Sequence, residues 1–117
     1  MVRQDNEKGS VTIANEVITW LAGDAAPRCF GVRGMAGRSK DGGLAQLLGR
    51  ESMTKGVFVS TEAEEIVSIA LHIVVDHSVN LATVCESIRN EVSYKVSSAT
   101  GVPVKKVDIY IDSIVME

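Results

Sequence analysis

The segment 66–76 constrains the fold most strongly, because large aliphatic side chains alternate along it with smaller or polar ones. A period of two is typical of a β-strand with one buried face and one open face. The residues expected on the buried face are Val67, Ile69, Leu71, Ile73 and Val75. The residues expected on the open face are Ser68, Ala70, His72, Val74 and Asp76. The preceding segment 57–60 is also strand-like, so a hairpin is the simplest pairing of the two strands.

The next segment changes from the period of a strand to the period of a helix. Its apolar residues recur every three or four positions, at Leu81, Val84, Ile88, Val92, Val96 and Ala99. Ser78 or Asn80 can cap the start of this helix, and Gly101 followed by Pro103 marks its end. The pattern predicts a long amphipathic helix that packs one apolar stripe against the sheet.

Less regular patterns predict the remaining elements. They are a short edge strand at 9–13, a helix from Ala14 that Pro27 ends and whose apolar stripe includes Val17, a mostly irregular glycine-rich segment at 30–43, one or two helical turns at 44–48, and a final strand at about 104–111. The final strand has a polar outward face, which predicts helices on one side of the sheet only. The expected fold is α/β: a two-layer sandwich whose mixed sheet of about four strands carries two main helices on one face.

Length and composition bound the domain organisation. The 117 residues suit one domain, and 45% of them are hydrophobic, which is enough to build a core. Seventeen valines and nine isoleucines against six leucines favour strands over an all-helical bundle. We therefore expect a flexible polar leader at 1–8 and a single domain at 9–117. The apolar runs are too short to span a bilayer, so we expect a cytoplasmic protein without direct membrane insertion.

The charge balance argues against nucleic-acid binding. Twelve Lys and Arg residues against 15 Asp and Glu residues give a net charge of −3, the wrong sign for a protein whose main task is binding phosphate backbones. The motif Gly31-Val32-Arg33-Gly34 is similar to the GxxG loop of KH domains. Such a loop needs a helix on each side, and the residues that follow it do not predict one. A small nucleic-acid-binding module is therefore the less favoured alternative.

The side chains that could act as nucleophiles or metal ligands do not form a recognisable site. They are His72, His77, Asp76, Cys29 and Cys85. His72 and Asp76 would lie about 13 Å apart on one strand face, too far for two ligands of one zinc ion. Arg28 could lower the pKa of the Cys29 thiol and make it reactive, but the default for a lone cysteine is a small buried hydrophobic residue. We expect no catalytic residue, no cofactor and no metal.

Exposed surfaces predict interactions with other proteins instead. On the open sheet face, a modest apolar patch is expected at Ala70, Val74 and Tyr110, among Ser68, Asp108 and Asp112. An ordinary solvated face is an equal alternative. The strand at 9–13 presents an exposed edge, and the glycine-rich segment offers a third surface. The candidate interaction residues are Val11, Ile13, Gly31, Val32, Arg33, Gly34, Met35 and Tyr110.

Segments spread over nearly the whole chain occur in an order that points to a known family. They are 9–18, 21–26, 31–35, 55–59, 74–77, the stripe of the long helix, Thr100-Gly101 and 107–111. Together they resemble the alkaline shock protein family of bacterial envelope stress response proteins, most closely its short YloU-type members from Gram-positive bacteria. Many relatives have Tyr-Gly where this chain has His77-Ser78, so the turn into the long helix is expected to differ here.

The resemblance implies a non-enzymatic cytoplasmic protein of the envelope stress response. It implies a scaffold or adaptor that self-associates into a homo-oligomer, in some members into filaments. The resemblance also implies a peripheral position at the inner face of the membrane, where an integral membrane protein holds it. Gene neighbourhood with a dihydroxyacetone-kinase-like protein of fatty acid phosphorylation implies the alternative of a regulatory partner for that enzyme. The family has no agreed catalytic residues, so none is transferred.

Overall fold

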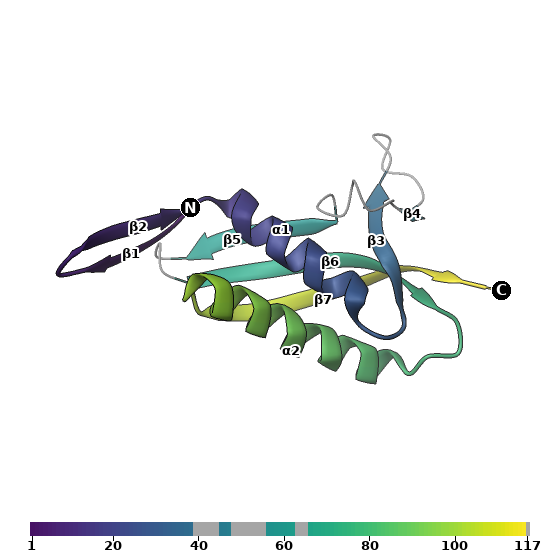
Figure 1. The fold of residues 1–117 in the computed structure, drawn as a ribbon. Helices are drawn as coiled ribbons and strands as arrows, with labels where there is room; N and C mark the ends of the chain where they lie inside the picture. Colours follow the sequence, from purple (N-terminus) through teal and green to yellow (C-terminus); the bar gives the residue numbers. More distant parts are fainter. Residues whose placement is uncertain (39–44, 48–55, 63–65, 117) are drawn as a thin grey trace.

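The computed structural model describes residues 1–38, 45–47, 56–62 and 66–116. The elements in chain order are β1 (Val2–Asn6), β2 (Gly9–Ile13), α1 (Asn15–Ala25), the 3-10 turn η1 (Ala26–Arg28), β3 (Val32–Arg38), β4 (Ala45–Leu47), β5 (Val57–Glu62), β6 (Ile66–Asp76), α2 (Leu81–Thr100) and β7 (Val104–Val115). Figure 1 shows α1 and α2 on one face of the main sheet, with the hairpin β1–β2 extending beyond it. The expected two-layer α/β sandwich with a mixed sheet is confirmed.

β6 is the central strand of the main sheet. Along one edge it pairs with β7 in parallel over residues 67–76. Along the other edge it pairs antiparallel with β5 over 66–71 and then with β3 over 73–75, so β5 and β3 lie end to end. The predicted hairpin of β5 and β6 is confirmed, and β7 continues four residues past the expected end of the final strand.

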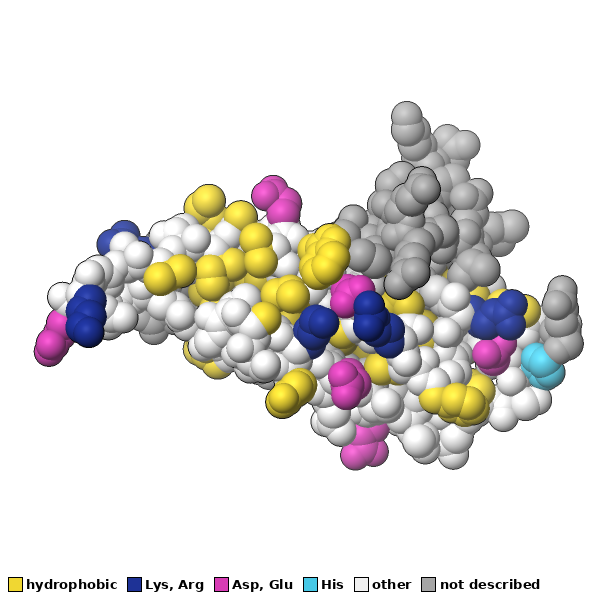
Figure 2. Space-filling view, viewed as in Figure 1, with side chains coloured by type: hydrophobic (Ala, Val, Ile, Leu, Met, Phe, Trp, Pro, Cys, Tyr) yellow, Lys and Arg dark blue, Asp and Glu magenta, His cyan; other side chains and the backbone are white. Residues whose placement is uncertain are grey.

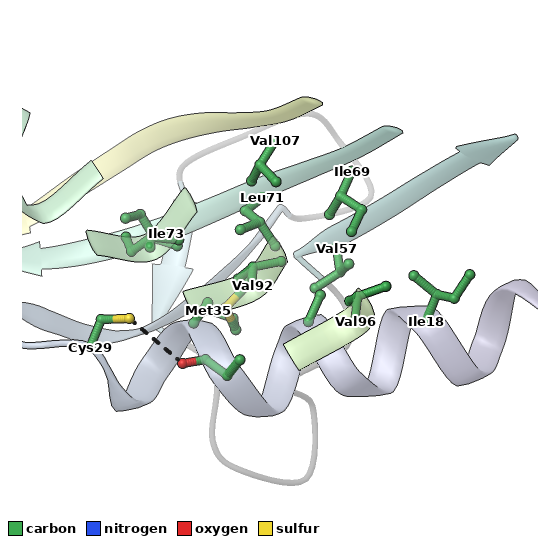
Figure 3. Close-up of a cluster of buried hydrophobic side chains, with 14 of the residues drawn as sticks. Ile18, Cys29, Met35, Val57, Ile69, Leu71, Ile73, Val92, Val96 and Val107 are labelled. Carbon is green, nitrogen blue, oxygen red and sulfur yellow. Dashed lines mark hydrogen bonds between the residues drawn. The ribbon is translucent and has the colours of Figure 1, made fainter. Parts of the chain in front are cut away.

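The alternation along β6 separates core from open face as predicted. The five residues of its inner face are each at most 1% exposed. Figure 3 shows Ile69, Leu71 and Ile73 from β6 and Val107 from β7 near Val92 and Val96 of α2. Burying an aliphatic side chain of this size contributes about 1.5–3 kcal/mol relative to leaving it exposed. The sheet and the helices are therefore held together mainly by this one apolar layer.

α1 and η1 form where the sequence predicts a helix closed by proline. The buried residues of this segment are Ile18, Ala22, Ala25 and Ala26, together with Gly23. Pro27 lies in η1, where its missing N–H ends the α-helical hydrogen bonding. Val17 was expected on the buried stripe, but it is 47% exposed. This expectation is wrong because Val17 lies one position from Ile18, about 100° around the helix.

α2 has the predicted caps and most of the predicted stripe. The Asn80 side chain accepts a hydrogen bond from the Thr83 N–H at 3.1 Å, and Gly101 ends the helix in the left-handed region at φ 75°. The buried residues are Val84, Ile88, Val92 and Val96. Leu81, at 39% exposed, and Ala99 lie at the two ends of the predicted stripe and face solvent, so the stripe is shorter than expected.

Two residues with positive φ shape the chain beside the start of α2. Gly31 has φ +90°, and its carbonyl accepts a hydrogen bond from the Asp76 N–H at 2.9 Å. Within the described ranges, Ser78 is the one non-glycine residue with positive φ, at 67°. An L-residue is strained there and glycine is not, so Ser78 carries a backbone cost in the turn that leads into α2.

β1 and β2 correct two expectations about the start of the chain. The expected flexible leader at 1–8 contains β1, whose Val2 is fully buried and pairs with Ile13. Among the described strands β2 pairs with β1 alone, so it is not an edge strand of the main sheet. The Gln4 amide donates to the Gly101 carbonyl at 2.9 Å and ties the hairpin to the end of α2. The polar sequence of β1 hid this strand, because most of its side chains face water.

β3 and β4 correct two expectations about the glycine-rich part of the chain. Residues 32–38 form a strand rather than an irregular segment, and 45–47 form a strand rather than a helical turn. The rest of the predicted loop and turn, at 39–44 and 48, lies outside the described residues. The glycine-rich strand β3 is held in the sheet by backbone hydrogen bonds to β6 and β4. It therefore needs no alternation of buried and exposed side chains, and its sequence shows none. A KH-type GxxG loop needs a helix after Gly34, but the residues that follow Gly34 belong to the strand β3.

Candidate functional site

The sheet face opposite the helices carries three ring side chains in contact. Phe58 on β5, His72 on β6 and Tyr110 on β7 point outward, because their neighbours along each strand point into the core. The rings of His72 and Tyr110 stack with centroids 4.7 Å apart and 10° between their planes. The Phe58 ring meets the His72 ring edge-on at 5.4 Å and 83°. We call these three residues the aromatic row.

A hydrogen bond to a carboxylate holds the middle ring of the aromatic row. His72 Nδ1 lies 2.9 Å from Asp112 Oδ2, and the two side chains are 19% and 7% exposed. A carboxylate on one ring nitrogen fixes the orientation of an imidazole. Among the residues that the structure describes, no group of three His, Cys, Asp or Glu side chains could hold a metal ion. The pair therefore positions the His72 ring, and through it the stack with Tyr110.

A shallow groove of about 210 Å³ lies on the same face, beside Phe58. Its lining includes the small side chains of Ser68 and Ala70, with Lys106 and Asp108 contributed by β7. Ser68 is 7% exposed, and its Oγ finds no hydrogen-bond partner within the described part of the chain. Leaving a buried polar group unpaired costs about 1–3 kcal/mol. A polar group that enters this groove would therefore be stabilised by Ser68.

The helix layer carries a second set of exposed apolar side chains. Trp20 and Val17 on α1 are 52% and 47% exposed, and Val11 on β2 is 57% exposed. Val17 and Trp20 lie three positions apart, so they share one side of the helix. Figure 2 shows hydrophobic side chains gathered over the start of α1 and the adjoining hairpin. The molecule therefore exposes large apolar groups on both of its layers.

A third concave region lies between η1 and α2. It has a volume of about 470 Å³ and is lined by Ala25, Arg28, Cys29, Phe30, Ser87, Glu91 and Lys95. Both cations are already paired, because Arg28 and Lys95 lie 3.2 and 3.3 Å from the Asp24 carboxylate. These ion pairs join η1 to α1 and α2 to α1, so we assign them a structural role.

Cys29 lies at the edge of this region as a buried thiol. It is 8% exposed, and its Sγ donates to the Ala25 carbonyl at 3.8 Å, the dashed line in Figure 3. Burial raises the pKa of the Cys29 thiol above its ordinary value of 9.0; the Ser87 hydrogen bond opposes this shift and the Glu91 charge adds to it. The suggestion that Arg28 makes this thiol reactive is therefore wrong, and a small buried residue is the better description.

We expect native Cys29 to react with a thiol-disulfide exchange reagent at least about tenfold more slowly than the same thiol in urea-unfolded protein at about pH 7. The thiolate is the reacting form, and the raised pKa lowers its population relative to the unfolded chain. The measurement uses the Cys85→Ser variant, with Cys29→Ser as the control that reports Cys85 alone. Equal rates in native and unfolded Cys85→Ser protein would contradict the buried thiol.

The predicted interaction residues at Gly31 and on the following strand β3 lie largely inside the protein. Gly31, Gly34 and Met35 are buried, with Met35 at 1% exposed in the core, and Val32 is half-buried against it. Arg33 is exposed, and its guanidinium donates to the Asp76 carboxylate at 3.1 Å. Among residues 31–35, Arg33 is therefore the one exposed side chain, so this described part of the glycine-rich segment offers a single charged group to a partner.

The other predicted interaction residues lie in two separate places. Val11 and Ile13 are on β2, where Val11 is exposed and Ile13 packs against the core. Tyr110 is on the open sheet face and is 49% exposed. Figure 1 shows the hairpin extending beyond the main sheet, so Val11 and Ile13 lie apart from Tyr110 and do not form one site with it.

The open face differs from its sequence prediction in two respects. Val74 was expected in the apolar patch, but it is 3% exposed. Phe58 was not considered, although the strand pattern at 57–60 places it outward, between the inward Val57 and Val59. The pairing of His72 with Asp112 had no local signal, since these residues lie 40 positions apart.

Comparison with known proteins assigns the chain to a family. The model of the alkaline shock protein 23 family, described as having a cell envelope-related function, matches residues 3–116. The chain belongs to this alkaline shock protein family. The match confirms the resemblance seen in the sequence, and it includes most of β1 as well as the sandwich.

Several relatives of this alkaline shock family chain are similar over most of their length. The uncharacterized protein YloU of Bacillus subtilis is 36% identical over 108 residues, which cover 91% of this chain and 88% of YloU. The uncharacterized protein YqhY of the same organism is 30% identical over 111 residues, or 95% and 81% of the two chains. The uncharacterized protein Spy1614 of Streptococcus pyogenes is 29% identical over 115 residues, or 97% and 93%. No solved structure matches.

The description of the family indicates an envelope-related role and names no enzymatic activity, and the relatives are described only as uncharacterized proteins. In the described part of this alkaline shock family chain, neither helix combines the length and the apolar character that crossing a bilayer requires.

Proposed function

We propose that this member of the alkaline shock protein family is a non-enzymatic scaffold or adaptor that self-associates at the cytoplasmic face of the membrane. One observation carries the proposal: large apolar side chains are exposed on both layers of the sandwich. Trp20 is 52% exposed on the helix layer, and Phe58 is 58% exposed on the sheet layer. Exposed apolar patches on folded proteins commonly mark interaction sites. A molecule with such side chains on two faces can contact a different neighbour through each of them.

The envelope-related role of the family supports the proposed location. We propose that an integral membrane protein recruits the chain, rather than the lipid surface itself. The net charge is −3, and the exposed Glu16 lies next to Val17 at the start of α1. An anionic inner leaflet attracts basic segments and repels acidic ones, so it would not hold this surface by charge.

Sedimentation velocity over a wide concentration range tests self-association. We expect the average mass to rise with protein concentration. If apolar contacts dominate, raising the salt concentration should leave this rise nearly unchanged, because salt screens charges between exposed groups. A single species of monomer mass at every concentration would contradict the proposal. For the location, a protein found only in the soluble fraction of lysed cells would count against the membrane face.

A further inference from the structure

We infer that the open face of β5, β6 and β7 is the self-association interface, and that its occupant is a second copy of the chain related by a two-fold axis. The inference rests on the proposed function and adds the surface and the symmetry of the contact. Three features of this face carry it: the relief of its side chains, its charge pattern and the unpaired hydroxyl of Ser68.

The large and small side chains of the open face can fit against those of a second copy of the same face. Phe58 and Tyr110 are 58% and 49% exposed and project, whereas Ser68 and Ala70 on β6 are small. The register places Phe58 and Asp108 on the two sides of Ala70. Two sheets that pack about 10 Å apart must fit large side chains of one over small side chains of the other. A second copy brings both kinds at once, so rings and small residues can alternate across the contact.

The open face carries neighbouring charges of opposite sign, which can pair with the same charges of a second copy. Lys106 and Asp108 are neighbours on the outer side of β7, with Nζ and Oδ2 3.6 Å apart, and their side chains are 57% and 48% exposed. A two-fold axis that passes near them would set Lys106 of each copy against Asp108 of the other. Opposite charges placed in this way fix the orientation of two surfaces and disfavour other arrangements. A strongly acidic or basic partner would leave one of the two charges facing its like.

Ser68 supplies an independent reason for an occupant. Ser68 is one of the residues that line the groove beside Phe58, it is only 7% exposed, and its side-chain oxygen has no hydrogen-bond partner in the described part of the chain. Buried hydroxyl groups in proteins are normally paired. The Tyr110 hydroxyl projects from the same face, so a second copy would bring a phenol able to donate to or accept from Ser68.

The size of the face sets the expected strength of association. At about 4.8 Å between strands and about 3.3 Å per residue, β6 and β7 over residues 67–76 and β5 beside residues 67–71 present roughly 400 Å² per copy. Two copies would then bury roughly 800 Å² in total, below the about 1,200 Å² at which standard stable interfaces begin. We therefore expect a weak dimer in exchange with monomer, not a permanent one.

A charge swap tests the interface without removing any core residue. In a two-fold dimer, K106D or D108K alone places like charges opposite each other, and we expect either to raise the dimer dissociation constant at least about tenfold. The double variant K106D/D108K exchanges the two charges and restores opposite pairing. It should return the dissociation constant to within about threefold of the unchanged protein. Sedimentation velocity measures the dissociation constant, and circular dichroism confirms that each variant is folded.

The control variant is R89E, on the exposed side of α2 in the helix layer. It changes the net charge by the same amount as K106D, so it should leave association unchanged. If R89E weakens association as much as K106D, or if all variants associate like the unchanged protein, the open face is not the interface although self-association stands. If the double variant stays as weak as the singles, the two-fold arrangement is wrong. An unchanged protein that is monomeric at every concentration overturns the proposed function itself.

Discussion

Replacing Gly31 with alanine is expected to lower the free energy of unfolding by about 3 kcal/mol. Gly31 has φ +90°, and a Cβ there would lie 2.9 Å from Val84 Cγ2 and 3.3 Å from Val79 Cγ1. A non-glycine residue in the left-handed region costs about 1–3 kcal/mol. Forcing a methyl group against the buried Val84 adds about 1–3 kcal/mol of overpacking. Urea unfolding followed by circular dichroism measures the loss.

Gly9→Ala is the matched control for Gly31→Ala. Gly9 also has positive φ, at 140°, but a Cβ there would meet nothing within 4 Å. The control therefore carries the backbone strain without the clash, and its loss of stability should be clearly smaller. Equal losses in the two variants would show that contact with Val84 contributes nothing. A Gly31→Ala protein as stable as the unchanged one would contradict the positive φ itself.

Truncating Ile88 to alanine is expected to cost about 3–4 kcal/mol. Ile88 lies in the middle of the buried face of α2, is fully buried, and belongs to the cluster that joins this helix to β6. Removing its outer methyl and methylene groups loses their burial and leaves a cavity that neighbouring side chains fill only in part. The same urea unfolding experiment gives the value, with the slope against urea expected to stay constant.

Leu81→Ala on the same helix tests whether the loss of stability depends on burial in the structure or on membership of the apolar stripe in the sequence. Both positions belong to the apolar stripe in the sequence, but Leu81 is 39% exposed in the structure. Because a truncation at an exposed position leaves no closed cavity, we expect a loss below about 1 kcal/mol. A loss at Leu81 as large as that at Ile88 would mean that the Leu81 end of the stripe is buried.

Elements with a strong period were predictable from the sequence. Along β6 every second residue is a large aliphatic, and along α2 the buried valines and isoleucine recur at three or four positions between recognisable caps. In both cases the same residues that define the element also bury its inner face. For β6 and α2, the secondary structure that the sequence pattern favours and the face that the fold buries therefore agree. The two-layer arrangement could be predicted from them.

Elements held by backbone pairing were not predictable in the same way. β3 contains Gly34 and Gly37, and β1 is mostly polar, so neither shows an alternating pattern. Their strands exist because partners distant in sequence, or across a turn, accept and donate their backbone hydrogen bonds. Such partners follow from topology, which the local pattern does not contain.

The open face was predictable in part. The alternation of β6 and β7 correctly placed Ser68, Ala70, Tyr110 and Asp108 on one side of the sheet. The contact of His72 with Asp112 required the parallel register of β6 and β7, in which His72 lies opposite Tyr110. A local pattern sets the face of a residue, whereas the neighbour across the ladder depends on a register that only the folded chain defines.

The end-to-end arrangement of β5 and β3 on one edge of β6 has a consequence for synthesis on the ribosome. Both strands precede β6 in the chain, and among the described strands β5 has its ladder with β6 alone. An emerging chain therefore carries β5 without a partner until β6 has left the exit tunnel. The segment 66–115 supplies β6, α2 and β7 as consecutive elements, and its strand β6 is the one with which the earlier strands β3 and β5 pair. During synthesis, β5 therefore keeps an unpaired strand edge until β6 is available.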